Sequence, residues 1–287
     1  MPSFLAYAKV NLGLEIIGKR SDGYHDVRTI MQEISLADRI DIEPAADLAI
    51  SCDLPDLENE TNLVMRAAVA LRACSPDQPG ARIRLEKRIP IAAGLGGGSS
   101  DAATTLVALN QLWGIGLERD ALMTIARQLG ADVGFFLLGG TAEARGIGDV
   151  LTPLPTPNLW LTIGVARPGI PDKTRRLYAA LEPEDLSSGE AVAEIAAAIR
   201  AGEPLQSSVL PSSFARVARS LIPEIGAIAS SFSHMGATAN LCGAGPAVIG
   251  LFAHADEALR VRDGLSAADI EAYTVRTVTR SERAGMP

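Results

Sequence analysis

The chain opens with an alternation of apolar and polar positions that is typical of a β-strand. Over residues 5–16, every second position is apolar. One face therefore carries Ala6, Ala8, Val10, Leu12 and Leu14, and the other carries Tyr7, Lys9, Asn11 and Glu15. This pattern predicts a strand that is buried on one face only.

Turn chemistry follows this strand and ends in the dipeptide Asp22-Gly23. Two further strand-like segments come next, at residues 27–34 and 39–43. Short strands joined by tight turns pair side by side in opposite directions. The opening of the chain is therefore predicted to be antiparallel β-structure.

Helical spacing of apolar residues dominates the next hundred positions. It predicts helices over residues 63–74, behind a possible cap at Thr61, and over 102–113 and 122–129, where Gly130 is a natural stop. Between the first two helices, residues 81–88 alternate as a strand does. The first half of the chain thus mixes strands and helices.

Pro153, Pro155 and Pro157 alternate in a stretch that cannot continue a helix or a central strand. We place a domain boundary there, which gives domains of residues 1–157 and 158–287. The second domain is predicted to contain strands at 159–166, 247–252 and 273–278, and helices at 174–181, 191–200, 214–230 and 256–265. Segregated helices and mixed strands indicate the α+β class.

Composition narrows the possible functions without choosing one. The chain has 287 residues, of which 47% are hydrophobic and 21% charged, as in ordinary folded proteins. No apolar stretch approaches the ~18 residues of a membrane helix, and Lys9 interrupts any leader-like core, so we expect a cytoplasmic protein without a membrane partner. The net charge of −8 argues against broad binding to nucleic acid. Cys52, Cys74 and Cys242 are too widely spaced for a zinc cluster or a disulfide framework.

A glycine-rich segment stands between the predicted strand 81–88 and the predicted helix 102–113. Four of the five residues 94–98 are glycine, and Ser99 and Ser100 follow directly. Backbone N–H groups in such a loop can converge on an anion, and the helix dipole adds positive potential. The spacing differs from that of P-loop enzymes and of dinucleotide-binding folds. The segment predicts a phosphate-binding loop of another kind, or else a surface turn in which Ser99 or Ser100 caps the helix.

Three segments together resemble the motifs of the GHMP small-molecule kinases. They are the glycine loop, the opening Ala8-Lys9-Val10-Asn11 and the later Leu241-Cys242-Gly243-Ala244-Gly245-Pro246. The resemblance spans nearly the whole chain. It implies an N-terminal ATP-binding domain of ribosomal-protein-S5-like topology, a C-terminal ferredoxin-like domain and an active site in the cleft between them.

The resemblance also implies roles for individual residues. Asp132 would be the general base that accepts the proton of the substrate hydroxyl, and Lys9 its electrostatic partner. Without the resemblance, we would interpret Asp132 as a helix N-cap and Lys9 as a charged residue at the edge of a strand. ATP would be held by Asn62, for which capping is the alternative role, and by the loop residues Pro90, Ile91, Ala92, Ala93, Gly94, Leu95, Gly96, Gly97, Gly98, Ser99 and Ser100.

A substrate site is implied in the same way. Its residues would be Asn11, Tyr24, His25, Thr174, Tyr178, Gly243, Ala244 and Gly245. Tyr24, His25 and Tyr178 suit recognition of a cytosine ring, although Tyr178 could equally belong to a helix core. Cys242 and Ala244 stand where family members commonly carry hydroxyl residues, and Gly134 stands where proline is usual, which gives the segment after Asp132 more freedom.

Two short segments, Asp22-Gly23-Tyr24-His25 and Gly130-Ala131-Asp132-Val133, narrow the resemblance to family members whose small-molecule substrate carries cytidine. It implies an ATP- and Mg²⁺-dependent kinase for the 2-hydroxyl of a cytidine diphosphate derivative of methylerythritol, in isoprenoid synthesis. It assigns no metal ligand beyond Ser99 or Ser100 as candidates. The alternatives are a GHMP kinase for homoserine or mevalonate, and a catalytically silent regulator that binds nucleotide.

Overall fold

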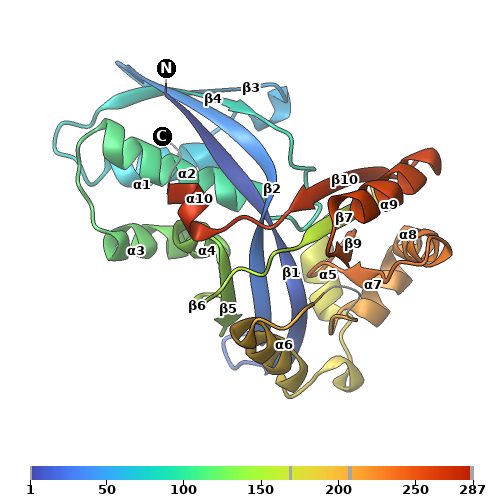
Figure 1. The fold of residues 1–287 in the computed structure, drawn as a ribbon. Coiled ribbons are helices and arrows are strands. Elements are labelled where there is room, and N and C mark those ends of the chain that lie inside the picture. Colours follow the sequence, from blue (N-terminus) through green and yellow to red (C-terminus); the bar gives the residue numbers. More distant parts are fainter. Residues whose placement is uncertain (1, 168–169, 206–208, 285–287) are drawn as a thin grey trace.

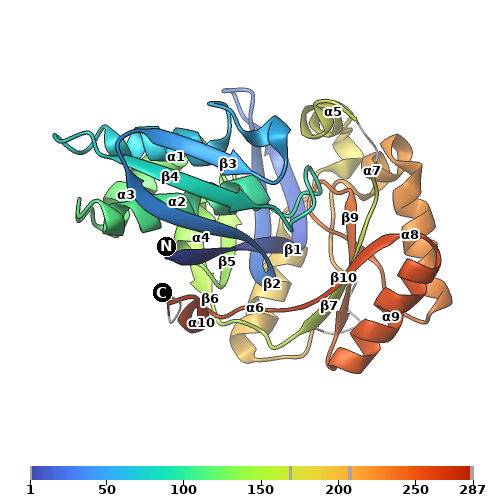
Figure 2. The same cartoon turned by 90° about the horizontal axis from the view of Figure 1, so that it is seen from above.

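Two β-sheets with flanking helices build the molecule, and two long strands run between its halves (Figure 1). The computed structural model describes residues 2–167, 170–205 and 209–284. Turned by 90°, the molecule shows one sheet in each half, with β1 and β2 between them (Figure 2). The predicted α+β class is confirmed.

The larger sheet is N-terminal and has six strands in the order β3-β4-β2-β5-β6, with β1 paired to β2. All of its neighbours are antiparallel except β3 and β4. Its strands are β1 (Ser3–Lys19), β2 (His25–Ala45), β3 (Leu48–Cys52), β4 (Gly80–Glu86), β5 (Thr141–Arg145) and β6 (Val150–Leu154). The antiparallel opening predicted from the sequence is therefore confirmed.

Four helices pack together against this sheet, with α2 in contact with β1 and β2. They are α1 (Leu63–Arg72), α2 (Gly97–Leu112), α3 (Arg119–Leu129) and α4 (Val133–Leu138), and a short 3₁₀ turn at Pro55–Leu57 precedes them. The predicted stop at Gly130 is confirmed, since this residue ends α3. The predicted cap at Thr61 is wrong, because Asn62 occupies the N-cap position and its side chain accepts the bond from Val64 N.

The smaller sheet has four antiparallel strands in the order β10-β7-β9-β8. They are β7 (Trp160–Val165), β8 (Asn240–Leu241), β9 (Ala247–Phe252) and β10 (Glu271–Arg276). The helices of this half are α5 (Lys173–Ala179), α6 (Glu190–Ala201), α7 (Ala215–Leu221), α8 (Pro223–His234) and α9 (Ala255–Ala267), with a 3₁₀ turn at Pro183–Asp185. Helix α9 packs on β7 and β10, whereas α6 packs on β1 and β2.

Three predictions about these elements are wrong for physical reasons. Segments 27–34 and 39–43 form the single strand β2. The predicted helix 214–230 is divided at Pro223, because proline lacks the N–H that would continue α7. Strand β1 is buried on both faces rather than one: Lys9 and Asn11 are 6% and 2% exposed, because residues far along the chain such as Cys242 cover this face, and their polar groups bond to one another there.

Apolar packing crosses the boundary predicted at residue 157. One hydrophobic cluster joins Val10 and Ile30 of the long strands to Ile163 and Ile249 of the smaller sheet. After β10 the chain returns to the N-terminal half, where α10 (Arg280–Ala284) lies (Figures 1 and 2). The two sheets therefore share one continuous interior along β1 and β2.

In the described part of the chain, no helix combines the length and apolarity needed to cross a bilayer.

Candidate active site

The glycine loop is held against β1 by backbone and steric contacts. The N–H of Lys9 donates to the Leu95 carbonyl at 2.9 Å. Gly96 precedes α2 with φ of +74°, and a Cβ there would come within 2.8 Å of the Phe136 ring and 3.0 Å of Lys9 Cγ. Glycine is required at this position because both the dihedral and the space exclude a side chain. The helix N-terminus is thus brought beside Lys9.

A cavity of about 350 Å³ lies along this loop. Its lining includes Asn62 and every loop residue from Pro90 to Ser99, whereas Ser100 is buried beneath it. The Asn62 amide is already engaged, since it accepts from Val64 N at 2.9 Å and donates to the Leu57 carbonyl at 2.8 Å. Free backbone N–H groups at the start of α2 make this cavity suited to a polyphosphate.

Lys9 and Asp132 face each other at the inner end of the loop. Lys9 Nζ lies 3.5 Å from Asp132 Oδ2, and the two side chains are 8% and 31% exposed. Asp132 occupies the N-cap position of α4 but makes no capping bond, so the role expected without the family resemblance is not realised. A carboxylate left available beside an ammonium is the arrangement that a general base needs.

A chain of hydrogen bonds fixes the lysine from the opposite side. Lys9 Nζ donates to Asn11 Oδ1 at 2.8 Å, Asn11 Nδ2 donates to Thr29 Oγ1 at 2.8 Å, and Thr29 Oγ1 donates to the Gly13 carbonyl at 2.7 Å. Thr29 is a positioning residue that the sequence analysis missed. Its position on the strand that pairs with Asn11's strand was the only available indication.

A larger cleft of about 950 Å³ is lined by both residues of this pair. It shares Ala92, Gly94 and Gly96 with the loop cavity. Both halves of the chain contribute to it, and the predicted site residues that line it are Lys9, Asn11, Tyr24, His25, Asp132, Thr174, Tyr178, Gly243 and Ala244. The structure therefore brings together nearly all of the predicted catalytic and substrate residues.

Aromatic rings form one wall of the cleft. The His25 and Tyr178 rings stack with centroids 4.8 Å apart, and Phe214 meets Tyr178 edge-on at 5.0 Å. Burial, with a smaller contribution from Lys19, lowers the pKa of His25 below its usual value, so the imidazole is neutral near pH 7. Neutral imidazole offers one donor and one acceptor nitrogen to a ligand.

The third glycine turn approaches the same place from the C-terminal half. A Cβ on Gly243, whose φ is +57°, would come within 2.7 Å of Asn11 Oδ1. Buried Cys242 accepts the Asn11 N–H at 3.4 Å. Gly245 does not line the cleft, but its carbonyl accepts a bond from Lys173 Nζ. Lys173 is a second residue that the sequence analysis did not assign to the site.

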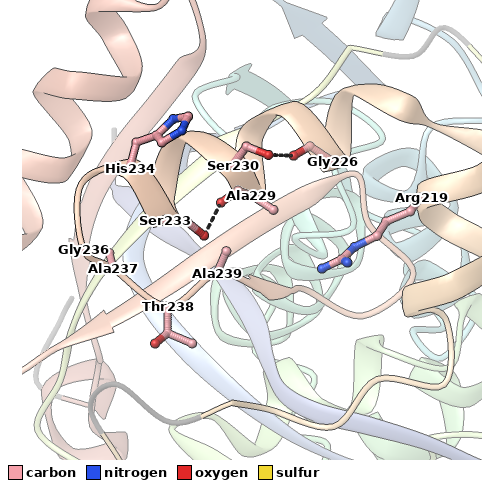
Figure 3. A pocket seen from close by; sticks show the side chains of 10 residues that line it. All are labelled: Arg219, Gly226, Ala229, Ser230, Ser233, His234, Gly236, Ala237, Thr238 and Ala239. Carbon is pink, nitrogen blue, oxygen red and sulfur yellow. Dashed lines mark hydrogen bonds between the residues drawn. The ribbon is translucent and has the colours of Figure 1, made fainter.

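Another hollow, of about 780 Å³, lies on α8 and the segment after it (Figure 3). The hydroxyls of Ser230 and Ser233 there donate to the Gly226 and Ala229 carbonyls of the same helix, at 3.0 and 3.1 Å. These hydroxyls serve the helix backbone, and His234 stands beside them without a metal-ligand pattern. The cleft at Lys9 and Asp132 is the better candidate for chemistry.

Comparison with known proteins agrees with this geometry. Residues 62–140 match the family described as GHMP kinases N terminal domain, and residues 187–270 match GHMP kinases C terminal. A 4-diphosphocytidyl-2-C-methyl-D-erythritol kinase of Dehalococcoides mccartyi is 39% identical, over 97% of this chain and 99% of its own. The same-named protein of Pelotomaculum thermopropionicum is 42% identical, over 95% and 96%.

Solved structures give the same result for the fold. A crystal structure of 4-(cytidine 5'-diphospho)-2C-methyl-D-erythritol kinase superimposes with a TM-score of 0.83 at 38% identity, over 96% of this chain and 98% of the other. Homoserine kinase from Cytophaga hutchinsonii shares only the fold, with a TM-score of 0.70 at 16% identity, over 97% and 95%. By sequence and by structure, the chain belongs to the GHMP kinase family and has its two-domain fold.

Proposed function

We propose that this protein transfers the γ-phosphoryl group of ATP to the 2-hydroxyl of 4-diphosphocytidyl-2-C-methyl-D-erythritol, a step of the non-mevalonate route to isoprenoids, in the cytoplasm. The observation that carries the proposal is the Lys9–Asp132 pair, which stands where the glycine-loop cavity meets an aromatic-walled cleft. Relatives named for this substrate, at 38–42% identity over nearly the full chain, support it. No nucleic acid or membrane takes part.

Asp132 accepts the proton as the substrate hydroxyl attacks the γ-phosphorus, and the bond from that phosphorus to the bridging oxygen of ADP breaks. Lys9 orients the Asp132 carboxylate and offsets the charge on the transferring group. Asn11 and Thr29 hold Lys9 in place. Positioning and electrostatics of this kind carry most of the catalysis in phosphoryl transfer.

The wall formed by His25, Tyr178 and Phe214 is the proposed site for cytosine. Its rings offer a face for stacking, and the neutral His25 imidazole offers both a donor and an acceptor to the base edge. Tyr24, 62% exposed, stands at the rim of the same cleft. This wall favours a substrate with a base over the small alcohols homoserine and mevalonate.

ATP supplies the phosphoryl group, and the free N–H groups at the start of α2 fit its phosphates. Mg²⁺ accompanies it in the proposed reaction. The described residues contain no group of three or more His, Cys, Asp or Glu side chains arranged for a metal, which fits an ion that leans on ATP phosphates and water. Ser99, which lines the loop cavity, is the candidate ligand, since Ser100 Oγ is buried.

The test is ADP release by the purified protein with Mg-ATP. We expect turnover with 4-diphosphocytidyl-2-C-methyl-D-erythritol and none with 2-C-methyl-D-erythritol 4-phosphate, homoserine or mevalonate. Turnover with one of the other alcohols would overturn the substrate and keep the chemistry. ATP binding without turnover on any of the four would favour the catalytically silent regulator.

A further inference from the structure

Lys173, the first residue of α5, reaches across the mouth of the active site. Its Nζ donates to the Ala92 carbonyl of the glycine loop at 3.0 Å and to the Gly245 carbonyl of the third glycine turn. A Cβ on Gly94 would lie 2.8 Å from the same Gly245 oxygen, so the two turns are in close approach there. The ammonium therefore sits between the two turns and lines the cleft.

Among the described residues, the Lys173 ammonium lacks an ion-pair partner, although most cations of this acidic protein have one. Burial lowers the pKa of Lys173 to about 8; the interaction with Cys242 opposes this shift, and a smaller interaction with Lys9 adds to it. A half-buried cation that meets only carbonyl dipoles is poorly compensated, and an anion at its free N–H would stabilise it.

The position of Lys173 beside the two cavities indicates which anion it binds. Ala92, whose carbonyl it contacts, lines both the loop cavity and the cleft. The group transferred between the two ligands must lie where these two cavities join. The turn at 242–245 contains no hydroxyl side chain, so a cation is the natural side-chain donor on the C-terminal side of that junction.

We propose that Lys173 contacts the γ-phosphate of ATP and holds it, together with Lys9, over the junction of the two cavities. Lys9 approaches from β1 and Lys173 from α5, so the transferring group is held by one cation from each half of the molecule. Lys173 is then a catalytic residue in addition to Lys9 and Asp132. The inference rests on the proposed function for the direction of transfer, but its nucleotide contact is testable without the alcohol.

The test compares nucleotides with and without the γ-phosphate. Calorimetry measures the Kd of the Mg²⁺ complexes of a non-hydrolysable ATP analogue and of ADP, for wild type and for Lys173→Met and Lys173→Arg. A charged hydrogen bond to the γ-phosphate is strong enough that its loss in Lys173→Met should raise the Kd of the analogue about tenfold or more. The Kd of ADP, which lacks this phosphate, should rise less than about twofold. Arg176→Met is the matched control, because Arg176 is an exposed cation of the same helix outside the cleft.

A pH series separates a phosphate contact from a structural clamp. The wild-type affinity for the analogue should weaken as pH rises through about 8, where Lys173 loses its proton, whereas Lys173→Arg should keep its affinity. The other charged or titratable groups that line cavities with Lys173 or interact with it are Lys9, Tyr24, His25, Asp132, Arg167, Asp172, Arg175, Tyr178, Cys242 and Glu271. These groups are present in both wild type and Lys173→Arg. The difference between the two curves of affinity against pH therefore reports the titration of Lys173.

Three results would overturn the inference. Equal losses for the analogue and ADP in Lys173→Met would mark Lys173 as a clamp between the turns. Weakened binding of the cytidylylated alcohol alone would assign Lys173 to the substrate's diphosphate. Unchanged Kd values in a variant with wild-type thermal unfolding would remove the contact altogether. None of these depends on turnover, so failure of the proposed function would be seen separately.

Discussion

At the residue scale, the proposed phosphorylation of a hydroxyl depends on the 3.5 Å contact between Lys9 Nζ and Asp132 Oδ2. Asp132 is partly exposed and uncapped at the start of α4, whereas Lys9 is buried and fixed by Asn11. The Asp132 carboxylate is thus accessible to a ligand, whereas the Lys9 side chain is held in one position. This division supports the proposed roles of proton transfer for the aspartate and charge compensation for the lysine.

Replacement of the base tests that assignment directly. Asp132→Asn keeps the size of the side chain but cannot accept the proton, so kcat should fall about 10²–10⁴-fold while ATP still binds. The measurement is steady-state turnover together with nucleotide Kd. Asp120→Asn, at an exposed position of α3, is the control. A kcat near wild type in Asp132→Asn would remove this residue from the role of base.

Lys9→Ala should lower kcat as well, because the transferring group loses a charge that acts mainly in the transition state. The fall in kcat should accompany an equal fall in kcat/KM. Both constants come from initial-rate measurements with each substrate varied in turn. A change confined to KM would instead mark Lys9 as a contact that binds ground state and transition state equally.

Tyr178 gives a prediction about the base pocket. Tyr178→Ala removes the ring that stacks on His25. Since stacking contributes about 1–3 kcal/mol per base, KM for the cytidylylated substrate should rise about 5–150-fold. Tyr178→Phe keeps the ring and should change KM little. If KM for ATP rose in parallel in Tyr178→Ala, the loss would reflect the cleft as a whole rather than the base.

At the element scale, a buried charge cluster anchors the segment that leads into the glycine loop. Asp38 Oδ1 accepts the N–H groups of Arg88 and Ile89, at 2.6 and 2.8 Å, directly before the loop. Lys87 Nζ donates to Asp38 and, at 2.7 Å, to Asp101 of α2. Strand β2, the end of β4 and the first turns of α2 are therefore joined at one point beside the loop cavity.

This cluster makes stability depend on pH. Burial raises the pKa of Asp101 from 3.8 to about 7, so between these values the native state holds a proton that the unfolded state does not. The free energy of unfolding should therefore fall as pH rises from about 4 to 7. Asp101→Asn, which does not titrate, should reduce this slope in urea titrations. An unchanged slope would show that other groups cause it.

Elements with a local pattern could be predicted from the sequence, and those set by distant contacts could not. The glycine loop and the motif residues Lys9 and Asp132 stand in recognisable strings, and helices α1 to α3 follow their apolar spacing. The full burial of β1 could not be predicted, because its polar face is covered by residues far along the chain. Thr29 and Lys173 were missed for the same reason: only folding brings them to Asn11 and Ala92.

At the scale of the whole molecule, helix α10 packs back onto the N-terminal half and forms an ion pair with β2. Glu33 of β2 is fully buried, forms an ion pair with Arg283 of α10, and accepts the Gly140 N–H at 2.7 Å. Burial raises the pKa of Glu33, and the arginine acts in the opposite direction. The C-terminal segment therefore neutralises a charge inside the N-terminal half.

Arg283→Met should lower the free energy of unfolding by about 3 kcal/mol at neutral pH, because it leaves a buried carboxylate without its partner. The deficit should shrink on acidification, since Glu33 then takes up a proton and the raised pKa no longer opposes folding. Urea titrations at two pH values measure both effects. The double variant Glu33→Gln with Arg283→Met should recover most of the loss, and failure to recover would place the cost elsewhere in α10.

The position of α10 also has a consequence for synthesis on the ribosome. Arg283 is synthesised 250 residues after Glu33. Domains usually fold as they emerge, N-terminal first, but here β2 keeps an uncompensated carboxylate until α10 has been synthesised. Nascent chains halted before residue 280 should hold the glycine loop, Lys9 and Asp132 in a half that has not reached its final stability. Acquisition of the active fold is thereby coupled to translation of the last helix.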